Sequence, residues 1–384
     1  MRRHLLRPAL RRGLAPLLLG TALQPLAAQQ IRPAALVWPA PPEQARIRYV
    51  GAISSETDVG KKESFLSRLG RSLVGGKRSG VVRVARPFDV AAVAPDRIFV
   101  SDGLTRGLLL FDPHRKEARL VGIDVPGGLS KPMGVGAGGH GSVLLADQLA
   151  RRVVVLDSLG RYQRAFGDTL SLLNPVDVAV DTTAGRYYVV DSYQHQVVVF
   201  DGKGALIQRL GRTAGGVRQG ASPSVGPDPS VPVHLGENGD ERPRTHDVVE
   251  NRGEAPGEFK YPWAVTVGAD GSVYVSDQMN FRVQMFDRRG KLVRVIGGIG
   301  TGPGHFARPK GVAVDSEGHL YVVDAAFGNV QVFDPEGALL LPFGTGGVAA
   351  GGQILPLGLA TDGNDRIYVV DRFNNRIQIY EYLK

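Results

Sequence analysis

The sequence predicts an all-β fold that is built from one repeated unit. The 384 residues include 51 glycines and 25 prolines, about a fifth of the chain, and turn-forming residues at this frequency exclude long helices as the main structure. Hydrophobic residues make up 43% of the chain, which is enough for a core and excludes global disorder. Six apolar segments that end in aspartate recur at intervals of 44 to 47 residues, with one interval of 86: RIFVSD, SVLLAD, RYYVVD, SVYVSD, HLYVVD and RIYVVD.

Each of these segments is the second strand of a predicted unit. A strand that begins at a proline precedes it, and a third strand such as QVVVF follows it. Most units add a fourth strand, for example KLVRVIG. Short apolar or alternating runs between glycine, aspartate and asparagine turns are typical of β-strands, and four-stranded units with a period of about 45 residues are typical of propeller blades. We therefore predict a six-bladed β-propeller of four-stranded antiparallel blades over residues 86–384.

The N-terminal residues predict export. Residues 1–28 carry five arginines and no acid, followed by an apolar stretch that ends at Ala27-Ala28, which is the pattern of a cleaved signal peptide. Removal of this segment lowers the net charge from +9 to +4. We expect a periplasmic or secreted protein, by the Sec or the twin-arginine route, with no nucleic-acid partner. The absence of cysteine excludes disulfides, thiolate metal sites and a lipid-modified cysteine.

A strand near the N-terminus is expected to close the ring. Residues 29–45 form a proline-rich lead, and residues 46–53 (RIRYVGAI) resemble the fourth strand of a unit. The last unit has only three strands before Lys384. We predict that residues 46–53 complete this last blade, which joins both ends of the repeat array in one sheet.

Residues 54–85 form a basic segment with a predicted short helix. From Lys61 to Arg86 the chain has eight basic residues and one acid. The side chains of Phe65, Leu66, Leu69 and Leu73 share one face of this helix. The segment could dock on an anionic envelope surface or an acidic partner, or pack against the propeller with its charges solvated.

Residues 212–257 account for the long interval between the third and fourth units. This segment has eight glycines, six prolines and no aromatic residue, so it cannot build the core of a seventh blade. We predict an exposed polar insertion.

Three segments resemble NHL repeats: GGIGTGPGHFARPKGVAVDSEGHLYVVD (297–324), NRGEAPGEFKYPWAVTV (251–267) and DRFNNRIQIYE (371–381). The likeness extends over about residues 86–383 and is strongest in the last three units. The first three units match only in their core strands and lack the GxGxGxF lead-in. The resemblance implies a six-bladed NHL propeller of the exported bacterial type.

The aspartates that end the second strands are the most regular polar feature: Asp102, Asp147, Asp191, Asp277, Asp324 and Asp371. A ring of carboxylates could hold calcium, which prefers oxygen ligands. An aspartate that recurs in every blade is better explained as an acceptor for backbone N–H groups of the adjoining turns. We expect the structural role and no cofactor.

The sequence shows no catalytic residues and no metal ligands. A zinc site needs about three convergent imidazoles, and His195, His305 and His319 do not occupy one position of several units. The GxSxG nucleophile motif is absent as well. We therefore expect a monomeric ligand- or protein-binding module or scaffold. The alternative is a metal-dependent lyase or a lactonase-like hydrolase on the same fold.

The residues after the lead-in prolines are expected to surround the mouth of the central channel: Phe88, Met133, Val176, Trp263, Lys310 and Leu357. Residues just after the repeat aspartates should flank the same face: Tyr193, His195, Phe281, Phe327 and Phe373. Such an apolar surface suits recognition of a protein or an envelope ligand. Alternatively, these side chains fill the channel, as in other small propellers.

Overall fold

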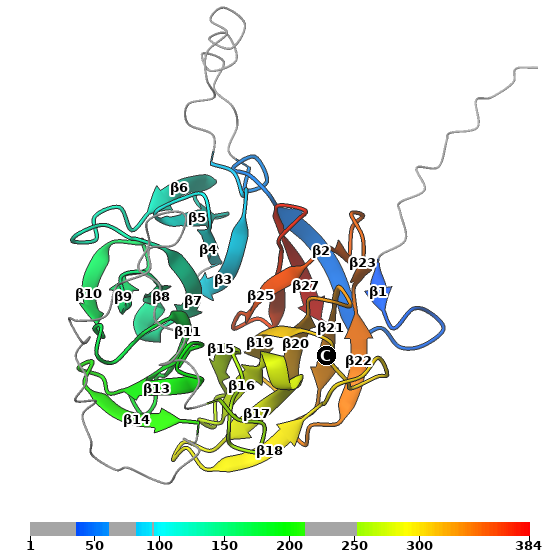
Figure 1. The fold of residues 1–384 in the computed structure, drawn as a ribbon. Coiled ribbons are helices and arrows are strands. Elements are labelled where there is room, and N and C mark those ends of the chain that lie inside the picture. The colour runs from blue at the N-terminus through cyan, green and yellow to red at the C-terminus, as the bar shows by residue number, and fades with distance from the viewer. Residues whose placement is uncertain (1–35, 61–81, 94–95, 212–251) are drawn as a thin grey trace, which may run out of the picture. The chain divides into compact units, whose positions relative to one another are not determined.

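Short strands rich in β-branched residues form six antiparallel sheets around a central axis, and the first strand of each sheet along the repeat begins at a proline (Figure 1). The computed structural model describes residues 36–60, 82–93, 96–211 and 252–384. The predicted signal peptide, the predicted helix around Phe65 and the insertion up to residue 251 lie outside the described residues.

The first three blades have four strands each. They are β3 (Pro87–Val93), β4 (Arg97–Asp102), β5 (Leu108–Asp112) and β6 (Glu117–Val121); β7 (Pro132–Ala137), β8 (Val143–Asp147), β9 (Arg152–Leu156) and β10 (Tyr162–Phe166); and β11 (Pro175–Asp181), β12 (Arg186–Asp191), β13 (Gln196–Phe200) and β14 (Leu206–Leu210). The first β-strand of each blade is the innermost. A short 3-10 helix, η1 (Gly139–Gly141), lies between β7 and β8.

The fourth and fifth blades repeat this order. They are β15 (Pro262–Val267), β16 (Val273–Asp277), β17 (Arg282–Phe286) and β18 (Leu292–Ile296); and β19 (Pro309–Val314), β20 (Leu320–Asp324), β21 (Asn329–Phe333) and β22 (Leu339–Phe343). The 3-10 helix η2 (Gln278–Asn280) follows β16. Before the sixth blade, β23 (Thr345–Gly346) and β24 (Gly352–Gln353) form a small parallel pair.

The sixth blade contains strands from both ends of the described chain. Its order is β25 (Pro356–Thr361), β26 (Arg366–Asp371), β27 (Arg376–Tyr382), β2 (Ile47–Ile53) and β1 (Val37–Trp38). The pairing of β2 with β27 runs from Ile47 opposite Tyr382 to Ile53 opposite Ile377. The predicted closing strand is confirmed. The strand β1 was not predicted, and it makes this sheet five-stranded.

The hydrophobic core lies between neighbouring blades. Six clusters of buried side chains each join two or more blades; one of them packs Val100 and Phe111 of the first blade against Tyr368 and Ile377 of the sixth. The innermost strands β3, β7, β11, β15, β19 and β25 contact one another in this order, and β25 contacts β3. Each blade therefore needs both neighbours to bury its faces.

The repeat aspartates fasten the lead-in loops to the second strands. All six are fully buried, and each accepts hydrogen bonds from backbone N–H groups about 17 residues upstream; for example, Asp102 binds the N–H groups of Ala85 and Arg86, both at 2.8 Å. The carboxylate of Asp277 also accepts a hydrogen bond from Arg282 Nε at 2.8 Å. These contacts give the aspartates a structural role in each blade.

The lead-in to the fourth blade overlaps with the end of the predicted insertion. Residues 252–257, which we assigned to the insertion, are held by this blade: Asn280 donates to the carbonyl of Gly253, and Arg282 donates to the carbonyls of Glu254 and Ala255, each at 2.9 Å. In the part of the chain that the structure describes, no helix is long and apolar enough to cross a bilayer.

The closing strand yields a test of ring stability. Ile47 is fully buried in the core between the fifth and sixth blades, so Ile47→Ala should lower the free energy of unfolding by about 2–5 kcal/mol. Val50 lies on the same strand and is 52% exposed, so Val50→Ala should change the free energy of unfolding by less than about 0.5 kcal/mol. Urea denaturation measures both. Equal effects would contradict a closing role for β2, as would an unchanged thermal midpoint after deletion of residues 46–53.

Candidate functional site

The antiparallel order places the lead-in loops and the turns between second and third strands at the same end of the ring, which we call the lead-in face. Here Phe88 of the first blade meets Trp263 of the fourth, with ring centroids 5.3 Å apart. Lys310 Nζ lies 3.1 Å from the centroid of the Trp263 ring and donates a hydrogen bond to Gln278 Oε1 at 2.6 Å. Side chains of three blades therefore fill the channel at this end.

The residues after the lead-in prolines form core more than surface. Met133, Val176, Lys310 and Leu357 are buried, with exposures of 2–8%, and Phe88 and Trp263 are half-buried. The expectation of an open apolar mouth is wrong for these residues. The innermost strands converge toward the axis, so their first side chains meet each other and fill the channel. This was the alternative to an open mouth.

The predicted flanking residues also differ in exposure. Phe373 is 63% exposed, whereas Tyr193, Phe281 and Phe327 are half-buried. His195 is fully buried: its Nδ1 accepts the backbone N–H of Tyr261 at 2.9 Å, and its ring packs edge-on against that of Tyr261. It therefore links the third and fourth blades and does not belong to the surface.

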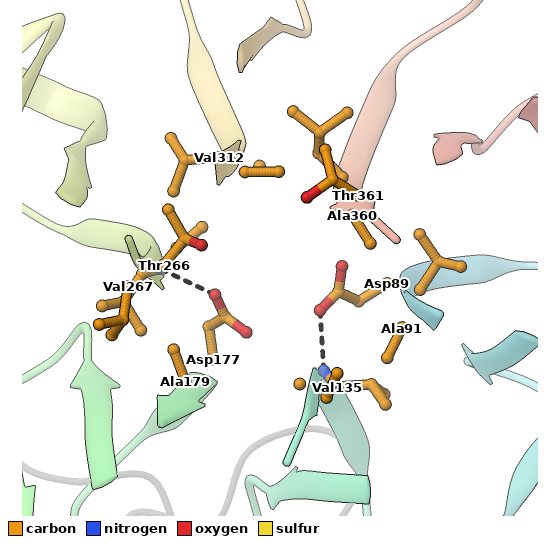
Figure 2. Close-up of a pocket in the computed structure, with 18 of the residues that line it drawn as sticks. Asp89, Ala91, Val135, Asp177, Ala179, Thr266, Val267, Val312, Ala360 and Thr361 are labelled. Atoms are coloured by element: carbon orange, nitrogen blue, oxygen red, sulfur yellow. Dashed lines mark hydrogen bonds between the residues drawn. The ribbon is translucent and has the colours of Figure 1, made fainter. Parts of the chain in front are cut away.

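The central channel contains a cavity of about 210 Å³ lined by all six innermost strands. The carboxyl groups of Asp89 (β3) and Asp177 (β11) point into it, as Figure 2 shows. Each aspartate comes two residues after its lead-in proline. At the equivalent position the second, fifth and sixth blades have glycine: Gly134, Gly311 and Gly358.

Backbone groups of neighbouring blades hold the two carboxyl groups. Asp89 Oδ2 accepts the N–H of Val135, and Asp177 Oδ2 accepts the N–H of Val265, both at 2.8 Å. A Cβ atom at Gly134 would overlap with Asp177, and one at Gly358 would overlap with Asp89. Glycine is therefore required beside each carboxyl group, since any side chain would displace it.

The cavity makes these aspartates unusual acids. Burial raises the pKa of Asp89 to about 7. Burial also raises the pKa of Asp177 well above its usual range, and the negative charge of Asp89 raises it further. Among the described residues, no lysine or arginine forms an ion pair with either group. The pair can therefore hold and exchange a proton near neutral pH.

Asp89 and Asp177 were not predicted from the sequence as site residues. The signal was present: in the aligned lead-in strands PFDVAAV and PVDVAVD, aspartate stands where three other units have glycine. A carboxylate at an inward position of an innermost strand is a candidate for the channel. Only the closed ring shows that the two carboxyl groups share one cavity.

The other histidines and acidic residues that the structure describes are not grouped as metal ligands. Within residues 36–60, 82–93, 96–211 and 252–384, no three histidine or acidic side chains are placed to hold a metal ion. His195 is buried between blades, while His319 binds Asp315 at the opposite end of the ring, with 2.9 Å between Nδ1 and Oδ2. Each repeat aspartate is engaged within its own blade, so these carboxylates do not converge on calcium.

Exposed apolar side chains gather on the lead-in face. Eight of its loop residues are large, apolar and 41–71% exposed: Leu104, Ile123, Leu149, Leu170, Met279, Ile299, Val348 and Phe373. Among the described residues of the turns at the opposite end, no large apolar side chain is comparably exposed. The remaining exposed apolar side chains lie at Leu36 or on strands at the rim, such as β14 and β18.

A groove on the lead-in face joins two of these side chains. Ile123 and Leu149 line it together with Leu129, Arg106 and the backbone of Gly127-Gly128, and its volume is about 420 Å³. Arg152 donates hydrogen bonds to the carbonyls of Pro126, at 3.1 Å, and Gly128, at 2.5 Å. These hydrogen bonds hold the loop that contains Gly127 and Gly128 in place.

The acidic pair predicts a pH-dependent stability. The pKa of Asp89 in the folded state, about 7, exceeds the unfolded value of about 4, so the folded state binds more protons between these pH values. Stability should therefore fall as the pH rises from about 4 to about 7. Asp89→Asn should remove the part of this fall that Asp89 causes and raise the free energy of unfolding at pH 8 by roughly 2–4 kcal/mol.

Urea denaturation at pH 5 and pH 8 measures this effect. Glu117→Gln removes one negative charge from an exposed position on β6 and serves as the control, with little effect at either pH. A destabilised Asp89→Asn variant at pH 8 would contradict a buried carboxyl group that resists ionisation.

Comparison with known proteins supports the fold. The model of the NHL repeat matches residues 172–200, in the third blade, and a model described as a 6-bladed beta-propeller matches residues 258–341. The NHL match therefore falls on the third unit and not on the last three, where we expected the strongest likeness. No curated protein sequence matches the chain.

Several solved structures share the fold at low sequence identity. A protein of unknown function from Bacteroides thetaiotaomicron has a TM-score of 0.55 at 17% identity, covering 86% of this chain and 75% of that chain. A gluconolactonase from Xanthomonas campestris has a TM-score of 0.52 at 14% identity (78% and 87% covered), and virginiamycin B lyase from Staphylococcus aureus one of 0.50 at 11% (81% and 86%). These likenesses show the fold alone. The chain is a six-bladed β-propeller that carries an NHL repeat.

Proposed function

We propose that this chain is an exported, monomeric binding module that takes a protein or an envelope ligand through its lead-in face. The observation that carries the proposal is the one-sided placement of the exposed apolar loop residues. Apolar side chains scattered over a surface need no explanation, whereas a set confined to one face and joined by a groove is typical of an interaction site. The propeller fold suits such a module.

The groove between Ile123 and Leu149 is the best candidate for the first contact. Ile123 is 70% exposed and Leu149 is 54% exposed, while Leu129 between them is buried. An apolar side chain of the partner would cover both walls and rest on Leu129. Arg106 lines the same groove and is exposed, so it can hydrogen-bond a polar group of the partner. An apolar anchor beside an arginine is a common centre of a binding interface.

The second candidate is a metal-dependent lyase or a lactonase-like hydrolase that works in the channel. The observation that favours it is the Asp89–Asp177 pair, because a carboxyl group with a pKa near neutral can act as a general acid or base. The side chains of Phe88, Trp263 and Lys310 fill the channel at the lead-in face, so a substrate would have to enter from the opposite end.

Charge substitutions test the binding face. The double variant Ile123→Asp/Leu149→Asp places two carboxylates in the groove, and we expect at least about a tenfold loss of partner capture because these charges lose their water on binding. Val293→Asp, at 51% exposure on β18, is the matched control and should capture the partner normally. Capture from envelope extract, quantified for the three proteins at equal folded concentration, gives the comparison. Equal capture by the parent protein, the double variant and Val293→Asp would refute the groove as the partner-binding site.

Metal analysis and lactone hydrolysis test the enzymatic alternative. The binding module needs no metal, so elemental analysis of the purified protein should show no stoichiometric zinc or calcium. A stoichiometric metal, together with a lactone hydrolysis that Asp89→Asn abolishes, would favour the hydrolase. This variant retains the size and the acceptor oxygen of the aspartate, so a loss of activity would report on the proton and the charge.

A further inference from the structure

A buried lysine without a carboxylate partner lies at the centre of the lead-in face. Lys310 is 6% exposed, and Nζ contacts only the Trp263 ring and Gln278 Oε1 in the hydrogen bonds and ring contacts of the described residues. A cation–π contact and one neutral acceptor compensate only part of the hydration that a buried ammonium loses. One of its three N–H donors is used by Gln278, which leaves capacity for another acceptor.

Two arginines add positive charge at the same place. Burial, together with the positive charges of Arg308 and Arg372, lowers the pKa of Lys310 to about 7. Arg308 is exposed, and Arg372 reaches toward the first blade, with its Nη1 3.3 Å from the carbonyl oxygen of Pro87. We call Lys310, Arg308 and Arg372 the mouth cluster. Arg86 of the first blade adds a fourth cation beside Arg372.

No acid neutralises the mouth cluster directly. Within the described residues, none of its three side chains forms an ion pair, although ten other lysines and arginines of the propeller do. An opposing charge acts on Arg372 from Asp102, but this carboxylate is fully buried and accepts hydrogen bonds from backbone N–H groups. Three cations from two neighbouring blades therefore lie near one another, and none of them has an ion-pair partner among the described residues.

We propose that the mouth cluster binds an oxyanion, the carboxylate or phosphate group of the ligand that the lead-in face takes. An oxyanion can accept hydrogen bonds from the ammonium and from guanidinium groups at once, which is a strong and specific arrangement. It also supplies the counter-charge that Lys310 lacks. The Trp263 and Phe88 rings border the site, so an apolar part of the same ligand can pack beside the anion. The inference rests on the proposed function only for the identity of the ligand.

Titration with sulfate tests the site without knowledge of the ligand. The chain has two tryptophans, and Trp38→Phe leaves Trp263 as the only one, so its emission reports on Lys310 directly. We expect a saturable change on addition of sodium sulfate at constant ionic strength. Lys310→Met should weaken binding at least about tenfold, as expected for loss of a hydrogen bond to a charged group. Lys291→Met, at an exposed turn of the opposite end, should leave binding unchanged.

A second variant covers the case in which Lys310→Met fails to fold. Arg308 is exposed and its side chain makes no hydrogen bond among the described residues, so Arg308→Gln should fold normally and weaken sulfate binding severalfold. An emission that does not saturate overturns the proposal, as does equal binding by Arg308→Gln and the parent protein. Comparison of acetate with sulfate shows whether the site prefers a planar carboxylate or a tetrahedral anion.

The pH dependence gives a readout that a purely structural lysine would not show. Sulfate keeps its charge between pH 6 and pH 9, and it binds the protonated form of Lys310. Affinity should therefore be constant below pH 7 and fall above it, because the pKa of free Lys310 is about 7. The other groups that face it are the always charged Arg308 and Arg372 and the neutral Trp263 and Gln278. Lys310→Arg should abolish the fall, and a fall that persists in this variant overturns the assignment to Lys310.

The outcomes also separate the two proposals. If the protein binds sulfate but its groove variants still capture the partner normally, the oxyanion site is supported and the groove is refuted as the partner-binding site. If the groove variants lose partner capture and the protein binds no sulfate, the groove is supported and the oxyanion site is refuted.

Discussion

The pairing of β2 with β27 is the interaction on which the other contacts of the propeller depend. Every core cluster lies between blades, so no blade can bury both faces unless the ring is closed. Closure occurs inside the sixth sheet, where β2 contributes Ile47 and Ile53 to the clusters on its two sides. Trp38 of β1 packs against Tyr380 of the same sheet and Phe343 of the fifth blade, so it adds to the core between these two blades. The convergence of the six innermost strands, and with it the channel, follows from this closure.

The channel contains two layers of opposite chemistry. Bulky side chains and Lys310 fill the layer next to the lead-in face. The next layer consists of small residues, and the space that they leave is occupied by Asp89 and Asp177. The layers follow from neighbouring positions on the same strands, since each residue after the proline precedes a glycine, an alanine or an aspartate. A side chain at Gly134 or Gly358 would overlap with the carboxyl group and the backbone of the neighbouring aspartate, so the acidic layer depends on these glycines.

The sequence predicts the repeat, the blade number and the closing strand because each depends on a local pattern. Residues 46–53 could be assigned to the last blade from their likeness to other fourth strands alone. The pairing of Asp89 with Asp177 could not be predicted, because 88 residues separate them and their proximity depends on the diameter of the ring. The burial of His195 was missed for a similar reason: a residue in a turn is expected at the surface, yet the neighbouring blade covers its side chain. For Lys310 the sequence left two possibilities open, an exposed mouth and a filled channel, and only the closed ring decides between them. Phe373 lies in a turn as well and is 63% exposed among the described residues, as the simple expectation predicts.

The register of the closing pair also determines how the ring responds to mechanical force. The strands are antiparallel, and the chain enters β2 at Ile47 and leaves β27 at Tyr382, which lie opposite each other. The Leu383 N–H bound to the carbonyl of Arg46, at 2.7 Å, and the ion pair between Arg48 and Glu381 lie at the same end. Tension between the segments before β2 and after β27 therefore loads these bonds one after another, as in unzipping, and not all together, as in shear. The closed ring would thus open at this one seam when it is pulled from its two ends.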